Sequence, residues 1–262
     1  MGALHEGHVA LIRRARRLAG LKGKVVVSIF VNPTQFGPGE DFSSYPRSFD
    51  ADRTLCKREG VDLLFHPSPD EMYEGDASIS IVERSLSKGL CGASRPGHFD
   101  GVCTVVAILF QILAPDIAVF GEKDWQQLAV IRRMVRDLRM PVRITGHPTV
   151  REDDGLALSS RNRLLSPEAR LVAPRIHQFL LAVVMEAENG ETSVVRLQKR
   201  LTEDLLSIPG ASVDYAQITD AATLYPLKRL ELGVPARVLV AVRLGGTRGV
   251  RLIDNLPILL PR

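Results

Sequence analysis

The stretch most suited to chemistry is His5-Glu6-Gly7-His8, which stands directly before a predicted helix over Val9–Leu18. Two histidines three positions apart project from the same side of a helix start. A helix N-terminus presents unpaired N–H groups and a partial positive charge, so phosphate binds there readily, and imidazoles add donors. Gly7 leaves room for a phosphate or adenine. A pair of structural histidines at a helix cap explains these four residues equally well.

A second polar stretch, Gly121-Glu122-Lys123-Asp124, follows a predicted strand over Asp116–Phe120. It opens a predicted helix over Asp124–Leu138. Ligands of open α/β sheets bind at the carboxyl ends of strands. A lysine there can neutralise phosphate, and an aspartate can hold Mg²⁺, which prefers oxygen ligands. The alternative is a simple helix N-cap, for which Asp124 is a suitable residue.

Three further stretches carry polar groups beside predicted strands or helices. The hydroxyls and guanidinium of Leu158–Asn162 suit a triphosphate, although a loop that caps the helix near Ser166 is an alternative. Asn32 and Gln35 follow a predicted strand, where carboxamides suit hydroxyl and carboxylate groups; an Asn-Pro turn is the alternative. The stretch Arg95–Gly101 is interpreted as a substrate-covering loop or a rigid turn.

These residues need a scaffold, and the first 150 residues predict one by alternating short β-branched runs with helical patterns. The predicted strands are Lys24–Val31, Asp62–Phe65, Asp116–Phe120 and Val142–Thr145, and the predicted helices are Val9–Leu18, Phe49–Glu59, Val102–Leu113 and Asp124–Leu138. This alternation is typical of an α/β domain with a parallel sheet and right-handed crossovers. If the sheet is parallel, the polar stretches converge on one of its edges.

The pattern changes after residue 150, with a hinge predicted around Gly155 and the polar run Ser159–Asn162. Helical stretches follow at about Ser166–Glu188 and Ser193–Leu206, and then strands at Val213–Ile218, Val238–Val242 and Val250–Ile253. Gly245 and Gly246 indicate a hairpin between the last two strands. We therefore predict an α/β domain over residues 1–150 and a smaller C-terminal α+β domain over residues 151–262.

Composition excludes several classes of protein. The 262 residues include 45% apolar residues, and 34 Lys+Arg against 30 Asp+Glu give a net charge of +4. The apolar content excludes disorder as the main state, and the weak charge argues against a nucleic-acid binder driven by bulk charge. No apolar run has the length of a membrane span or the character of a signal peptide. Cys56, Cys91 and Cys103 form no CxxC pair, which favours a reducing, cytosolic compartment.

In their order along the chain, these motifs resemble the pantothenate synthetase (pantoate–β-alanine ligase) family, a member of the wider HxGH nucleotidyltransferase-like group. The resemblance rests on Met1–His8, Phe30–Gln35 with Tyr45-Pro46-Arg47, Arg95–Gly101, Gly121–Gln127 and Val150–Asn162, and more faintly on Val213–Tyr215 and Leu252–Asn255. It implies a Rossmann-like parallel-sheet domain with a smaller C-terminal α+β lid domain. It also implies a cytoplasmic homodimer with no nucleic-acid or membrane partner.

The reaction implied by the resemblance has two steps. ATP and pantoate, with Mg²⁺, give an enzyme-bound pantoyl adenylate and pyrophosphate. The amine of β-alanine then attacks the activated acyl carbon, which releases AMP and pantothenate. A carboxylate is a poor electrophile toward an amine, and adenylation supplies a good leaving group. Adenylation itself needs positioning and charge neutralisation more than covalent help.

The resemblance also assigns roles to matching residues. His5, His8 and Lys123 would be catalytic, with His8 the proton donor to the departing pyrophosphate, and Asp124 would lie near Mg²⁺. Gln35 and Gln127 would hold pantoate, with Gln35 also near β-alanine and Asn32 supporting the pocket. The ATP-binding set would be Met1, Gly2, Ala3, Leu4, His5, Glu6, Gly7, His8, Gly121, Glu122, Lys123, Asp124, Val150, Leu158, Ser159, Ser160 and Arg161.

Two departures from the family pattern affect the interpretation. Trp125 stands where Tyr is more usual and keeps an aromatic body with a polar N–H. The sequence begins at Met1 inside the HxGH motif, whereas the family carries a strand before it, so we expect the sheet to lack its first, central strand. Two alternatives therefore stay open: a nucleotide-binding module without turnover, and a nucleotidyltransferase acting on a phosphorylated acceptor. The second would require basic residues at Gln35 and Gln127.

Overall fold

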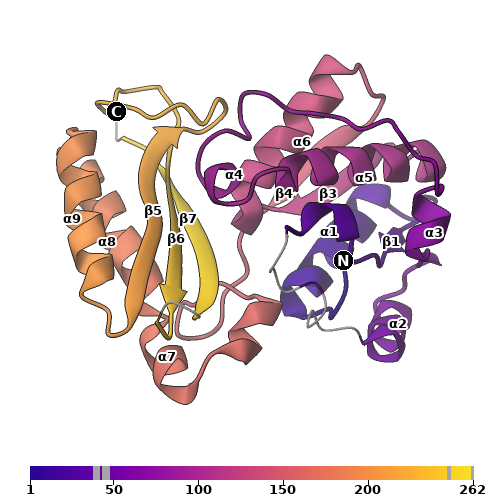
Figure 1. The fold of residues 1–262 in the computed structure, drawn as a ribbon, viewed down its shortest axis with the longest axis horizontal. Coiled ribbons are helices and arrows are strands. Elements are labelled where there is room, and N and C mark those ends of the chain that lie inside the picture. Colours follow the sequence, from indigo (N-terminus) through magenta and orange to yellow (C-terminus); the bar gives the residue numbers. More distant parts are fainter. Residues whose placement is uncertain (38–41, 43–47, 247–248, 261–262) are drawn as a thin grey trace. The chain divides into compact units, whose positions relative to one another are not determined.

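The computed structural model of the chain describes residues 1–37, 42, 48–246 and 249–260 (Figure 1). The chain divides into two compact units. The N-terminal unit consists of Met1–Lys88, Gly92–Glu122 and Val130–Thr149, and the C-terminal unit consists of Gly89–Cys91, Lys123–Ala129 and Val150–Arg262. The division runs through helix α6 (Trp125–Asp137), whose first residues belong to the C-terminal unit.

The N-terminal unit alternates helices with short strands, as the sequence predicts. Its elements are α1 (Glu6–Ala19), β1 (Val26–Ser28), α2 (Phe49–Arg58), β2 (Leu63–Phe65), α3 (Pro69–Met72), α5 (His98–Leu113), β3 (Ile117–Gly121) and β4 (Arg143–His147), with α4 (Cys91–Ser94) and α6 crossing the division. β1 pairs with β2 and β3 pairs with β4, both in parallel. The α/β class is confirmed, but these strands form two pairs, and no described strand joins β1 to β3.

Helix α1 packs on β1 through an apolar stripe. Val9 and Ile12 are buried, and Ile12 belongs to a core cluster that includes Val25 and Val27. Two arginines of this helix form ion pairs. Arg13 binds Glu59, and Arg16 binds Asp62, whose pKa is lowered to about 2 by the Val25 N–H and then by Arg16. These contacts attach the helix to the segment before β2.

Several elements differ from the predicted bounds for local reasons. α1 begins at Glu6 and α5 at His98, so Gly7, His8 and the end of Arg95–Gly101 lie inside first helical turns. The predicted strand Lys24–Val31 is reduced to β1. The predicted helix over Ser166–Glu188 divides into α7 (Pro167–Val172) and α8 (Arg175–Glu188), because Pro174 has no N–H for a continuous helix.

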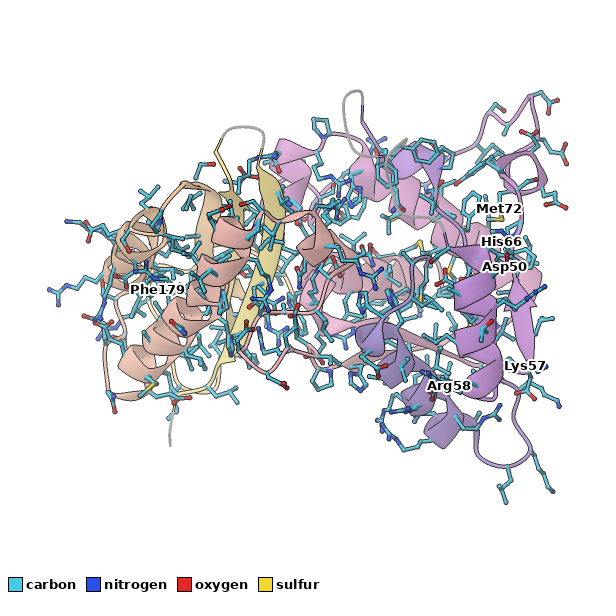
Figure 2. The ribbon with its side chains drawn as sticks, turned by 90° about the horizontal axis from the view of Figure 1, so that it is seen from below. Asp50, Lys57, Arg58, His66, Met72 and Phe179 are labelled. Carbon is cyan, nitrogen blue, oxygen red and sulfur yellow. The ribbon has the colours of Figure 1, made fainter. Side chains whose placement is uncertain are left out.

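The C-terminal unit is an antiparallel sheet covered by helices. Strands β5 (Ala211–Asp220), β6 (Ala236–Leu244) and β7 (Val250–Ile258) lie in that order, and the predicted hairpin between β6 and β7 is confirmed. Helices α8 and α9 (Val194–Leu206) lie against one face of this sheet (Figure 1). Alternate residues of β6, such as Val238 and Val240, enter their shared core, and Phe179 of α8 packs against it (Figure 2).

No helix in the described part of the chain combines the length and apolar character that a bilayer crossing requires. Cys56, Cys91 and Cys103 are all free and buried. Burial raises the pKa of the Cys103 thiol to about 12. This thiol is therefore neutral at physiological pH.

Candidate active site

The two histidines of the HxGH motif cap the start of α1. His5 is the N-cap residue, and its Nδ1 accepts the backbone N–H of Gly7 at 3.2 Å. His8 lies in the first turn, and its Nδ1 accepts the backbone N–H of His5 at 3.2 Å. A ring nitrogen that accepts a hydrogen bond carries no proton, so each neutral imidazole carries its proton on Nε2. The Nδ1 atoms of the two histidines therefore cap the helix, as one interpretation of the motif predicts. Their Nε2–H groups are hydrogen-bond donors at the same helix N-terminus.

The residues before His5 are held in place. The backbone of Met1 pairs with β1, its nitrogen donating to Ser28 O at 3.1 Å and its carbonyl accepting from Phe30 N at 2.9 Å. The carboxylate of Asp52 accepts the N–H groups of Ala3 and Leu4. Those two N–H groups therefore point at Asp52, so a nucleotide contact from Ala3 or Leu4 would use other backbone atoms.

The turn after β1 is built around Asn32, which is 2% exposed. Its Oδ1 accepts from the hydroxyls of Tyr73 at 2.7 Å and Thr34 at 3.0 Å. Its Nδ2 donates to the Gly101 carbonyl at 3.1 Å. Asn32 therefore organises the turn, whereas the half-buried Gln35 ends it as the last residue of a 3₁₀ turn over Pro33–Gln35.

The Arg95–Gly101 stretch stabilises this turn through hydrogen bonds and close backbone packing. The side chains of His98 and Arg95 both donate to the carbonyl of Gln35, at 2.7 and 3.3 Å. A Cβ at Gly101 would lie 2.4 Å from the Thr34 carbonyl oxygen, so only glycine fits there. The rigid-turn alternative accounts for these contacts. The continuation of the β1 motif, Tyr45-Pro46-Arg47, lies outside the described residues.

Lys123 and Asp124 occupy a 3₁₀ turn over Glu122–Asp124, immediately before α6. The Lys123 ammonium lies 3.7 Å from the Asp124 carboxylate, and Asp124 is the more exposed of the two. The backbone of this turn is held by Asn255 of β7, whose Nδ2 donates to the Lys123 carbonyl at 2.9 Å. Asn255 is 4% exposed, so this bond is shielded from water.

The start of α6 is attached to the antiparallel sheet through Trp125. Its Nε1–H donates to the Ala221 carbonyl at 2.9 Å, and the guanidinium of Arg237 lies 3.5 Å from its ring centroid. The polar N–H noted in the sequence therefore has a defined use. The next residue, Gln126, accepts the Cys91 N–H and donates to the Gly89 carbonyl. Gln127 lies in the same first turn and is half-buried.

The Val150–Arg161 segment forms a narrow turn followed by a 3₁₀ helix over Ser160–Leu164. The Leu158 N–H donates to the Val150 carbonyl at 3.0 Å, and Ser159 Oγ accepts the Arg161 N–H at 3.2 Å. Asn162 connects the two parts by donating to Glu152 at 2.7 Å. The cap that the sequence placed near Ser166 is also present, since Ser166 caps α7.

Beneath this turn lies an ionic cluster on α8 and β7. Arg151 binds Asp254 through two hydrogen bonds of 2.7 and 2.9 Å. His177 Nδ1 lies 3.8 Å from the same carboxylate. Burial and the charge of Arg151 lower the pKa of His177, while Asp254 opposes that shift. We infer a neutral imidazole at pH 7, because its pKa falls below 6.5.

The predicted site residues fall into two groups. His5, His8, Asn32, Gln35 and Gly121-Glu122 belong to the N-terminal unit, and Lys123, Asp124, Gln127, Val150 and Leu158–Arg161 belong to the C-terminal unit. Sequence reasoning missed Asp52 and Arg237 and reached Asn255 only through a faint motif. A buried acid on the apolar side of a helix, near Cys56, was the available signal for Asp52.

The carboxylates and other possible metal ligands of the structure can be compared with what Mg²⁺ requires. In the described ranges no three His, Cys, Asp or Glu side chains gather to hold a metal. Mg²⁺ in nucleotide enzymes is bound by one or two carboxylates together with substrate phosphates and water. The partly exposed carboxylate of Asp124 fits that arrangement.

An imidazole-capped helix start in the N-terminal α/β unit and a lysine-bearing turn before α6 are each suited to binding phosphate and are typical of nucleotide-dependent transferases and ligases. A profile of the family described as pantoate-beta-alanine ligase matches residues 1–257. A pantothenate synthetase of Nocardioides sp. is 52% identical over 99% of this chain and 77% of its own length. One of Thermotoga petrophila is 50% identical over 97% of this chain and 88% of its own length.

Solved structures agree with these relatives. The crystal structure of pantothenate synthetase from Thermus thermophilus has a TM-score of 0.91 at 50% identity, covering 100% of this chain and 91% of that one. A pantoate-beta-alanine ligase from Francisella tularensis, complexed with beta-gamma ATP and beta-alanine, has a TM-score of 0.76 at 34% identity, covering 98% and 86%. The chain belongs to the pantoate–β-alanine ligase family and is an ATP-dependent ligase.

Proposed function

We propose that the two groups of site residues act on the same ATP during the ligation of pantoate to β-alanine. In the first step a pantoate carboxylate oxygen attacks the α-phosphorus of ATP, and the bond to pyrophosphate breaks. In the second the β-alanine nitrogen attacks the acyl carbon, AMP leaves, and the nitrogen loses a proton. The observation that carries the proposal is the pair of Nε2–H donors that His5 and His8 hold at the N-terminus of α1.

The imidazoles and Lys123 would stabilise the charge that develops on the departing pyrophosphate. His8 would donate a hydrogen bond from Nε2–H to a pyrophosphate oxygen, because its Nδ1 accepts the His5 N–H and the ring is therefore neutral. Ser159, Ser160 and Arg161 would contact the phosphates, and Val150 would contact adenine through its backbone. Pre-positioned donors of this kind contribute most where negative charge develops in the transition state.

Mg²⁺ would accompany ATP and neutralise phosphate charge. Asp124 would be its protein ligand, in keeping with an oxygen-preferring ion that is held mainly by substrate phosphates. Lys123, close to Asp124, would supply a second positive charge to the phosphates. Glu122 and the backbone of Gly121 would complete this side of the nucleotide site.

Pantoate recognition would rest on uncharged side chains. Gln35 and Gln127 offer both donors and acceptors to hydroxyl and carboxylate groups, and Asn32 keeps the Gln35 turn in shape. A phosphorylated acceptor would call for basic residues at these two positions, so the carboxamides support the ligase over other nucleotidyltransferases. The C-terminal unit would act as a lid that keeps water from the mixed anhydride.

The test is substrate-dependent formation of AMP and pyrophosphate. We expect turnover only when ATP, Mg²⁺, pantoate and β-alanine are all present. His8→Ala and Lys123→Ala should each lower kcat/KM on the order of a thousandfold, or several kcal/mol of transition-state stabilisation. ATP binding without turnover would support the inactive-module alternative, and near-wild-type activity of either variant would refute its assigned role.

Two properties of the family complete the proposal. We expect a homodimer, which light scattering coupled to size-exclusion chromatography measures directly as mass. We also expect a cytoplasmic location, consistent with three buried free thiols. A monomeric mass at micromolar concentration would contradict the first expectation without affecting the assignment of the site residues.

A further inference from the structure

Asp52 is a buried acid that the reaction itself does not use. It lies on α2 and is 2% exposed. Its Oδ1 accepts the Leu4 N–H at 2.7 Å, and its Oδ2 accepts the Ala3 N–H at 2.9 Å. The hydroxyl of Ser48 donates a weaker bond to Oδ1 at 3.3 Å. Within the described ranges no lysine or arginine pairs with this carboxylate, so backbone amides are its main partners.

The two amides that Asp52 binds immediately precede the first catalytic histidine. Ala3 has a φ of +49°, a left-handed conformation that residues other than glycine rarely adopt. The carboxylate therefore holds a strained turn whose next residue is the N-cap His5. From there the bonds continue, because His8 holds the His5 N–H and His5 holds the Gly7 N–H. Side chains thus hold the backbone amides from Ala3 to His5.

Helix α2 is itself fixed, which makes Asp52 a firm support. Phe49, at its start, stacks on His66 with ring centroids 4.2 Å apart. Nδ1 of His66 donates to the Ile29 carbonyl, just after β1, at 2.7 Å. Figure 2 shows His66, which follows β2, and Asp50, Lys57 and Arg58 of α2. A displacement of the Asp52 carboxylate would move the turn that sets the orientation of both imidazoles.

We propose that Asp52 is a positioning residue for adenylation: its carboxylate fixes the Ala3–Leu4 amides and thereby directs the imidazoles of His5 and His8 toward the phosphates. This inference rests on the roles proposed above for the two histidines. It requires a carboxylate in particular, because both acceptor oxygens are used by N–H groups. An amide at the same position would present an NH₂ group to one of those N–H groups.

The decisive variant is Asp52→Asn, compared with Asp50→Asn on the same helix. Asp50 loses the same charge but is 89% exposed and pairs only with Arg53 in the described structure. We expect Asp52→Asn to lower kcat on the order of 10- to 100-fold, because small displacements of catalytic groups have effects of that size. The kcat/KM for β-alanine should be unchanged, because β-alanine reacts after adenylation. Asp50→Asn should keep wild-type kcat.

A double-mutant cycle with His8→Asn separates positioning from general stability. If Asp52 acts through the histidines, Asp52→Asn should lower kcat by a smaller factor in the His8→Asn background than in the wild-type protein, the remaining loss coming from His5. An equal fold-loss in both backgrounds, or wild-type kcat for Asp52→Asn alone, would overturn the inference. Failure of the proposed function would look different, because wild-type protein would then form no pantoate-dependent pyrophosphate.

A milder variant covers the case in which Asp52→Asn does not fold. Ser48→Ala removes only the 3.3 Å bond to Oδ1 and should lower kcat a few-fold. Hydrogen exchange of the peptide that contains Ala3 and Leu4 should become faster in this variant at an unchanged melting temperature. Wild-type exchange together with wild-type kcat in Ser48→Ala would count against the inference.

Discussion

The imidazole rings of His5 and His8 lie side by side with centroids 4.1 Å apart, and Nδ1 of His8 accepts the backbone N–H of His5. In each ring Nδ1 binds the backbone, whereas Nε2–H is the group proposed to contact phosphate. The same residues can satisfy both the capping explanation and the catalytic one, which a sequence motif of four residues leaves undecided. Substitutions that keep one nitrogen's role and remove the other's separate the two.

The first prediction uses asparagine for this separation. In His8→Asn the amide oxygen can still accept the His5 N–H, but the Nε2–H donor is gone. We expect about a thousandfold loss of kcat with a melting temperature close to that of the wild type. In His5→Asn the N-cap is preserved, whereas His5→Ala should lose about 1 kcal/mol of stability as well. Calorimetry beside pyrophosphate-release kinetics measures both effects.

The contrary result for these variants is specific. If His8→Asn kept activity and lost stability, the histidine would be a cap and nothing more. If His5→Asn and His5→Ala had the same melting temperature, the Nδ1 bond to Gly7 would contribute nothing to folding.

The second prediction concerns the bond from Asn255 to the Lys123 carbonyl. Asn255→Ala leaves that carbonyl without its buried donor, which should cost about 1–3 kcal/mol of folding free energy. The Lys123 turn should also shift, so the KM for ATP should rise while the KM for β-alanine stays constant. Steady-state kinetics and urea unfolding measure these changes.

Asn189→Ala is the matched control for Asn255→Ala. Asn189 is exposed at the end of α8 and belongs to neither group of site residues. It should keep the wild-type KM for ATP and lose less than about 0.5 kcal/mol of stability. A rise in the KM for ATP equal to that of Asn255→Ala would show that the effect is not local to the Lys123 turn.

The sequence predicts the element types well because local signals agree with the tertiary contacts. The apolar runs that become β1 to β4 and the amphipathic pattern of α6 needed no knowledge of distant partners. The predicted helix starts at Val9 and Val102 are later than the observed ones, because His5 and Gly97 cap their helices through geometry that composition does not reveal. Pro174 is the sequence signal for the division of Ser166–Glu188, because proline has no N–H for a continuous helix.

The supporting residues of the site were harder to predict than the motif residues. Asp52 binds amides 48 and 49 positions away, and Asn255 binds a carbonyl 132 positions away. No spacing rule connects positions so distant, because their proximity depends on the complete fold. Motif residues, in contrast, follow strand ends or precede helices, where their chemistry is visible locally.

The third prediction tests the support behind the Gln35 turn. In Gly101→Ala the new Cβ would lie 2.4 Å from the Thr34 carbonyl oxygen. The gain in helix propensity, about 1 kcal/mol, should be outweighed by this clash, for a net loss of about 2 kcal/mol. The displaced turn should also raise the KM for pantoate. Gly75→Ala is the control, because no described atom lies within 4 Å of its new Cβ.

Melting temperatures and pantoate kinetics of the two glycine variants decide the matter. A Gly101→Ala protein as stable as the wild type, or more stable, would mean that the helix moves away from Thr34 at little cost. A loss of stability in Gly75→Ala of the same size would show that the Gly101 effect is not due to the clash.

The fourth prediction is a pH dependence that comes from His177. Its pKa is lowered from 6.5 by burial and by Arg151, with Asp254 acting in the opposite direction. Between pH 6.5 and the lower folded-state pKa, the unfolded chain binds the additional proton, so stability falls as the pH falls through this window. Below the folded-state pKa both states are protonated and this contribution no longer changes.

His177→Gln removes the titrating group and should therefore show a smaller loss of unfolding free energy between about pH 7 and pH 5 than the wild-type protein. Urea titrations at the two pH values measure the difference. His147→Gln, which lies outside the Arg151–Asp254 cluster, should leave the wild-type dependence in place. A His177→Gln protein with the full wild-type loss would show that the buried imidazole takes up its proton without opposing the fold, and that Asp254 outweighs burial and Arg151 together.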